Sequence, residues 1–168
     1  EDIQIVQKFA AINREAILTE IVKGMKWKVQ ESYSCIHNYV ESAETSYTGA
    51  PIIRKGAISA KKGEKVIIPV NMQAGIILGT GKGNDDWNQS APHGAGRLYK
   101  RSDMRQNFTV SQFKKAMAGI YSSCVSEGTL DEAPFAYRNL EDILQVIGDT
   151  VDVDQVIHPI YNYKAGNE

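Results

Sequence analysis

Residues 52–72 read IIRKGAISAKKGEKVIIPVNM, a stretch that brings β-structure into the fold. Two runs rich in β-branched residues, 52–58 and 65–70, flank the polar segment Lys61-Lys62-Gly63-Glu64. Gly63 suits a turn position with a positive φ, which glycine adopts without steric cost. The pattern therefore predicts a β-hairpin across residues 52–72.

The sequence before this stretch predicts a helix and then a strand. Residues 1–25 carry apolar side chains at three- and four-residue steps, which is typical of a helix, and Gly24 offers a C-terminal stop. Residues 27–40 alternate in character, as in a strand with one face formed by Tyr33, Cys35, His37 and Tyr39.

The sequence after it contains an irregular segment, two more helices and a final strand. Residues 75–96 are rich in glycine and predict loops. Thr109 and Gln112 have the spacing of a capping box, and Asn139 is placed to cap a short helix over 140–147. Residues 151–163 have strand character, interrupted by Pro159. We predict one α+β domain over residues 1–168, with mixed sheet layers and flanking helices.

Composition excludes several classes of protein. The chain has 168 residues, a net charge of −1 and 42% hydrophobic residues, as expected for one soluble domain. It has no run of about 18 apolar residues, so we expect no membrane span. The first residues show no signal-peptide pattern. The two cysteines are too few for a disulfide framework and favour a reducing compartment, so a cytoplasmic location is predicted.

Charge is distributed unevenly along the chain. Residues 51–115 contain 12 Lys and Arg but four acidic residues, giving +8, whereas the remainder carries −9. A basic middle segment suggests an anionic ligand such as phosphate or nucleic acid. A solvated surface is the alternative interpretation.

Two glycine clusters are candidates for phosphate binding. Gly79, Gly81 and Gly83 match neither the dinucleotide nor the Walker A spacing, so they form either a phosphate loop or a surface loop. The second cluster, SAPHGAGR at residues 90–97, contains a histidine. His93 could be a metal ligand, a general base, a nucleophile or a turn histidine held by local backbone.

The other two histidines are weaker candidates. His37 and Cys35 are two residues apart and could hold a transition metal from one strand face, or His37 could be a half-buried strand residue. His158 shows no functional pattern.

Residues 90–97 resemble the signature of the RtcB-type RNA-splicing ligases. Further blocks resemble that family in the same order and extend over nearly the whole chain: Ile36–Tyr39, Arg54–Ala57, Pro69–Met72, Gly81–Asn88, Thr129–Tyr137 and Pro159–Lys164. The resemblance implies a GTP- and manganese-dependent ligase. Such an enzyme joins RNA 2′,3′-cyclic phosphate or 3′-phosphate ends to 5′-hydroxyl ends. Its substrates would be tRNA halves or broken RNA.

The resemblance also implies roles for individual residues. His93 would be guanylylated, and His37 would bind manganese. The implied nucleotide site consists of His37, Asn38, Pro69, Val70, Asn71, Met72, His93, Gly94, Ala95, Gly96, Tyr137 and Lys164. The implied track for RNA phosphates consists of Arg54, Lys55, Arg97 and Arg101.

The resemblance covers the C-terminal half of such a ligase, and the family's remaining metal ligands belong to an N-terminal half. We therefore expect weak or no activity from this chain alone, and either self-association or pairing with the other half. Two alternatives to a ligase remain: a half-enzyme that binds nucleotide or RNA without catalysis, and an inactive fragment.

Overall fold

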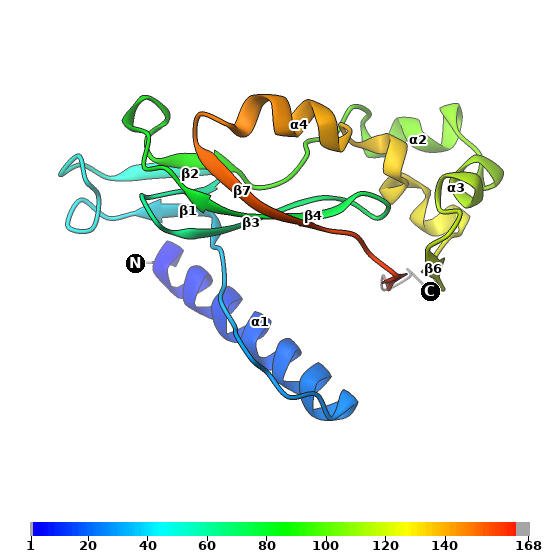
Figure 1. Cartoon of the computed structure of the whole chain (residues 1–168), viewed down its shortest axis with the longest axis horizontal. Coiled ribbons are helices and arrows are strands. Elements are labelled where there is room, and N and C mark those ends of the chain that lie inside the picture. The colour runs from blue at the N-terminus through cyan, green and yellow to red at the C-terminus, as the bar shows by residue number, and fades with distance from the viewer. Residues whose placement is uncertain (1, 164–168) are drawn as a thin grey trace.

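The fold was determined as a computed structural model, which describes residues 2–163. It is an α+β structure, as the sequence predicts, with two three-stranded antiparallel sheets at its centre (Figure 1). One sheet has the order β1 (His37–Glu41), β2 (Ile52–Ser59), β5 (Ser90–Pro92). The other has the order β3 (Lys65–Asn71), β4 (Gly75–Gly81), β7 (Val151–Ile157).

The predicted hairpin over residues 52–72 is wrong, although both strands and the turn between them exist. Gly63 has a φ of +80°, and the Glu64 amide donates to the Lys61 carbonyl at 2.9 Å. However, β2 pairs with β1 and β5, whereas β3 pairs with β4, so the turn carries the chain from one sheet to the other. The local turn was predictable, but the partners of the two strands are set by contacts far away in the sequence.

The strand predicted over residues 27–40 is shorter than expected, because β1 begins at His37. The loop predicted over residues 75–96 is wrong in its first part, which is β4. A Cβ on Gly79 would lie 2.5 Å from Val151 Cγ1, and one on Gly81 would lie 2.5 Å from the Lys61 carbonyl oxygen. These two glycines therefore allow close strand packing and form no phosphate loop.

Helices and short strands surround the sheets. Helix α4 (Leu140–Ile147) is capped by Asn139, and α3 (Val110–Ala116) begins with the predicted capping box of Thr109 and Gln112. The remaining elements are α2 (Arg101–Asn107), the 3-10 turns η1 (Asp85–Trp87), η2 (Glu127–Glu132) and η3 (Pro134–Ala136), and the parallel pair β6 (Tyr121–Ser122) and β8 (Tyr161–Asn162).

Two apolar clusters form the core. The first joins both sheets to α4 through residues such as Ile58, Ile68 and Ile147. The second lies among α2, α3 and η2 and includes Met104 and Phe113. Tyr137 packs against both clusters and therefore lies at the boundary between them.

Helix α1 (Asp2–Met25) confirms the predicted N-terminal helix but lies outside this core. Figure 1 shows it projecting away from the sheets, and none of its residues is buried. Phe9 is 70% exposed and Ile5 is 63% exposed. Within the described residues, no helix is both long and apolar enough to cross a lipid bilayer.

Candidate active site

His93 lies where the chain leaves the sheet after β5. Pro92 pairs with Ala57 of β2, and the His93 amide then donates to the Gly56 carbonyl at 3.3 Å. Gly56 has a φ of +71°, and its own amide donates to Oδ1 of Asn38 at 2.7 Å. Asn38 lies at an irregularity in the β1–β2 register, where its side chain replaces a regular strand hydrogen bond. These contacts fix the position of the backbone at His93.

The rings of His37 and His93 lie parallel to each other. Their centroids are 5.5 Å apart, with an interplanar angle of 5°. Partial burial lowers the pKa of His93 below its ordinary value, and the nearby His37 and Lys55 lower it further. His93 is therefore largely neutral at pH 7, and a neutral imidazole has the free lone pair that a nucleophile or a metal ligand needs.

His93 borders two cavities. One, of about 760 Å³, lies between α1 and the sheets and is also lined by His37, Cys35 and Arg14; we call it the histidine cavity. The other, of about 700 Å³, lies between the segment 69–72, the loop 93–97 and Tyr137; we call it the glycine-loop cavity. His93 can therefore face ligand groups in either cavity.

The glycine-loop cavity gathers most of the nucleotide-binding residues implied by the resemblance. Those that line it are Pro69, Val70, Asn71, Met72, His93, Gly94, Ala95, Gly96 and Tyr137. His37 lines the histidine cavity, and Asn38 lies on β1 beside it. Lys164 lies outside the described residues.

Backbone contacts hold the two halves of the glycine-loop cavity together. The Ala95 amide donates to the Pro69 carbonyl at 3.1 Å, and a Cβ on Gly94 would lie 3.2 Å from the same oxygen. Gly96 has a φ of +71°, which favours glycine. Asn71 holds the turn after β3, because its Oδ1 accepts from the amides of Gln73 and Ala74 at 3.0 and 2.8 Å. The glycines thus let the loop lie directly against the end of β3.

Tyr137 is fixed by charged neighbours on one wall of this cavity. Its hydroxyl donates to Oε2 of Glu132 at 2.7 Å and accepts from Nη1 of Arg97 at 2.9 Å. The Arg97 guanidinium lies 4.9 Å from the ring centroid. Burial, and then the hydrogen bond and charge of Glu132, raise the pKa of Tyr137 to about 12. The ring is therefore neutral, with Arg97 beside it.

Arg97 and Arg101, two of the residues implied for RNA phosphates, are paired with groups of η2. Arg97 Nη2 donates to the Asp131 carbonyl at 2.6 Å. Arg101 Nη1 donates to Glu132 Oε1 at 2.6 Å and also pairs with the Asp131 carboxylate. Both guanidinium groups are already paired within the chain, although Arg101 remains 64% exposed on its side chain and lines the glycine-loop cavity.

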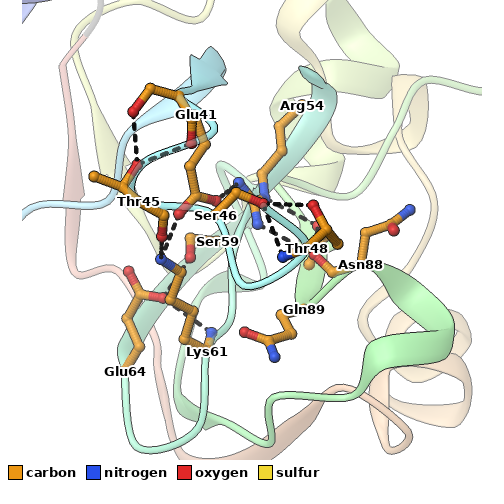
Figure 2. A network of polar contacts seen from close by, with 12 residues as sticks. Glu41, Thr45, Ser46, Thr48, Arg54, Ser59, Lys61, Glu64, Asn88 and Gln89 are labelled. Carbon is orange, nitrogen blue, oxygen red and sulfur yellow. Dashed lines mark hydrogen bonds and ion pairs between the residues drawn. The ribbon is translucent and has the colours of Figure 1, made fainter. Parts of the chain in front are cut away.

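Arg54, also implied for RNA phosphates, is buried. Figure 2 shows its side chain inside a polar network, and the residue is 2% exposed. Its Nη1 lies 2.6 Å from Glu41 Oε2, its Nη2 donates to the Asn88 carbonyl at 3.1 Å, and its Nε donates to Ser90 Oγ at 3.0 Å. Strand pairing therefore turns Arg54, one of the residues implied for RNA phosphates, inward to protein groups. Its neighbour Lys55 is exposed.

Cys35 and His37 do not form a metal site by themselves. The Cys35 thiol donates to the Lys65 carbonyl at 3.3 Å, and burial raises the pKa of the thiol, which disfavours the thiolate form that binds metals. Over residues 2–163, no group of three His, Cys, Asp or Glu side chains is arranged to hold a metal ion.

Sequence reasoning missed three residues of this region. Gly56 and Glu132 orient His93 and Tyr137, and Arg14 reaches the histidine cavity from the middle of α1. Arg14 is one of several charged residues of α1, so its charge alone gave no signal of this position.

Comparison with known proteins agrees with the resemblance. The model of the family described as tRNA-splicing ligase RtcB matches residues 1–165. The RNA-splicing ligase RtcB of Escherichia coli K12 is 31% identical over 170 residues, covering 95% of this chain and 41% of its own length. The tRNA-splicing ligase RtcB of Aeropyrum pernix is 32% identical over 136 residues, covering 68% of this chain and 28% of its own. The chain thus spans about two fifths of the length of the E. coli relative.

Proposed function

Because this chain belongs to the RtcB family of tRNA-splicing ligases, we propose that it carries the histidine nucleophile of an RNA ligase. His93 is that nucleophile in the proposal. The proposal is supported by one observation: nine of the twelve implied nucleotide-binding residues, His93 included, line the glycine-loop cavity. The relatives are named as RNA- or tRNA-splicing ligases, and ligation by the whole protein is part of the proposal.

The proposed reaction transfers GMP twice and then joins the two RNA ends. The neutral imidazole of His93 attacks the α-phosphorus of GTP, a P–N bond forms, and pyrophosphate leaves with the electron pair of the broken P–O bond. An RNA 3′-phosphate oxygen then attacks the same phosphorus and releases the histidine. Finally, the RNA 5′-hydroxyl attacks the activated 3′-phosphate, loses its proton and displaces GMP. Covalent catalysis of this type divides one difficult step into easier ones.

The chain supports the first transfer in four ways. The lowered pKa keeps the His93 lone pair available. Gly96 has space beside its backbone, so a phosphate can approach the loop there, and Gly94 lets the loop pack against Pro69. Arg97 and Arg101, although paired with acidic groups, place positive charge on the wall of the same cavity. Tyr137, whose ring orientation is fixed, is proposed to stack on the guanine base.

The described residues do not supply a complete manganese site. They offer the imidazoles of His37 and His93, but no third metal-binding side chain beside them. A metal held by His37 would therefore need further ligands, which the described residues do not provide. Manganese dependence remains a proposal that rests on the family alone.

A second candidate function follows from the same observation. Because residues 2–163 hold no full metal site, the alternative is that the chain binds nucleotide or RNA at the glycine-loop cavity without catalysing a transfer. RNA, supplied as tRNA halves or broken ends, is the proposed partner in both cases. A second polypeptide, either another copy or a further part of a longer ligase, is a proposed partner for the exposed α1.

Intact-mass spectrometry after incubation with GTP and manganese separates the two functions. A mass increase of one GMP in the chain, lost in His93→Ala and kept in His158→Ala, is the result expected for the nucleophile. His158 is a matched control because it is exposed and lines neither cavity. Binding of GTP without any adduct would favour the second function, and an adduct retained in His93→Ala would refute the assignment.

A further inference from the structure

Arg14 is one of four partly buried residues of α1, whose other side chains are exposed. It lies in the middle of α1, and its side chain lines the histidine cavity opposite the sheet strands that carry His37 and His93. Its Nε and Nη2 atoms are shielded from solvent, yet neither has a hydrogen-bond partner among residues 2–163. All the salt bridges of this part of the chain use other basic residues.

The two unpartnered atoms define what this side chain can bind. A guanidinium remains charged at any physiological pH, and leaving its buried donors unpaired is unfavourable. Nε and Nη2 belong to the same edge of the guanidinium plane, so their N–H bonds point in nearly the same direction. That edge is complementary to two oxygens of one oxyanion, either carboxylate or phosphate.

The surroundings favour phosphate. Besides Arg14 and one carboxylate, Glu15, the cavity wall carries the hydroxyl-bearing residues Ser32, Tyr33 and Ser34, together with the imidazoles of His37 and His93. A phosphate has further oxygens that hydroxyl groups can contact after the arginine edge has taken two of them. A carboxylate has only the two. The volume of about 760 Å³ accommodates a nucleotide-sized group.

We propose that Arg14 binds a phosphate group in the histidine cavity and so positions it beside His93. This inference rests on the proposed function, since His93 is the group that would act on the bound ligand. The phosphate could belong to a mononucleotide or to the 3′-end of an RNA. Arg14 is then a positioning residue that joins α1 to the site.

Equilibrium binding tests this role without requiring catalysis. The probes are a fluorescein-labelled ten-nucleotide RNA with a 3′-phosphate, the same RNA with a 3′-hydroxyl, and GMP as a competitor. The buffer contains EDTA, so that no divalent metal bridges the ligand to the protein. The variants are Arg14→Gln, Arg14→Lys and the control Lys8→Gln, which removes an exposed charge from the same helix.

The expected result is a preference of the full chain for phosphate-bearing ligand that depends on Arg14. Loss of a charged two-bond contact weakens binding by about tenfold or more, so Arg14→Gln reduces affinity by that factor. Arg14→Lys keeps the charge but not the paired donors and recovers only part of the affinity. Lys8→Gln changes the affinity less than twofold, as expected for an exposed charge that the ligand does not contact.

The two ligand arms identify the source of the phosphate. A loss confined to the 3′-phosphate RNA assigns the site to the RNA end, and a loss of GMP competition assigns it to the nucleotide. Unchanged affinity of Arg14→Gln for both ligands overturns the proposal, as does a wild-type chain that binds 3′-phosphate and 3′-hydroxyl RNA equally and GMP not at all. Unchanged phosphate affinity with altered self-association would instead assign Arg14 to a protein carboxylate.

The binding test and the test of the proposed function can each fail without the other. If a GMP adduct forms on His93 while Arg14→Gln binds normally, only the role of Arg14 is wrong. If phosphate binding depends on Arg14 but no adduct forms, the site exists and the histidine chemistry is wrong. Circular dichroism of Arg14→Gln confirms that α1 remains helical in the comparison.

Discussion

Removing the carboxylate of Glu41 should destabilise the sheet that carries both histidines of the candidate site. Glu41 ends β1 and accepts from Arg54 of β2, and Arg54 also donates to the Asn88 carbonyl (Figure 2). The Nε of Arg54 donates to Ser90 Oγ, three residues before His93. The network therefore joins β1, β2 and β5. Glu41→Ala leaves the Arg54 charge in place without its counter-charge.

The expected loss of stability in Glu41→Ala follows from the burial of the Glu41–Arg54 pair. The side chains of Arg54 and Glu41 are only 1% and 5% exposed, so water cannot replace the lost partner. Burial alone would raise the pKa of Glu41, but the hydrogen bonds and charges of Lys61 and Arg54 outweigh it and hold the pKa below its ordinary value. Breaking a buried pair of this kind costs about 3–5 kcal/mol. Lys61 contributes less to that loss, because its side chain is 39% exposed and can turn to solvent.

Urea unfolding followed by circular dichroism measures this loss. With a urea m-value of about 2 kcal/mol/M, the unfolding midpoint of Glu41→Ala falls by about 2 M. The double variant Glu41→Ala/Arg54→Met should recover part of the stability, since it also removes the uncompensated charge. Glu31→Ala is the matched control: Glu31 pairs with Lys65 on the surface, where both side chains are more than half exposed, and its midpoint should not move measurably.

Two results would refute the reasoning about the buried pair. One is a midpoint for Glu41→Ala no lower than that of the surface control. The other is strict additivity in the double variant, because two residues that interact directly through opposite charges should show a coupling free energy.

Two further predictions concern the site and the exposed helix. In an NMR titration of the histidine ring resonances, His93 should take up its proton below pH 6.5, because burial and the positive charges of His37 and Lys55 disfavour the imidazolium. Lys55→Gln should move the midpoint of this titration upward. A midpoint above pH 6.5 in the unmodified chain would contradict the prediction. In sedimentation velocity, the chain should associate as its concentration rises, because apolar side chains of α1 are exposed. The double variant Ile5→Gln/Phe9→Gln should reduce this association. A monomer throughout the concentration range would contradict the prediction.

The sequence by itself determined the features that depend on near neighbours. The helix over residues 1–25, the capping box of Thr109 and Gln112, the Asn139 cap and the turn at Gly63 all appear where they were predicted. Each is set by contacts within about four residues, so the local pattern carries the necessary information. The family was also recognisable from sequence, and the family model matches residues 1–165.

Only the tertiary structure decided which segments meet. Gly79 belongs to the central strand of a sheet rather than to a phosphate loop, and Arg54 turns inward to pair with Glu41 rather than outward to a ligand. The burial of a charge depends on a partner elsewhere in the chain, which residue type and local spacing do not specify. The same holds for the candidate site, where strand pairing brings residues 69–72 against His93, and the placement of α1 brings Arg14 to the cavity beside it.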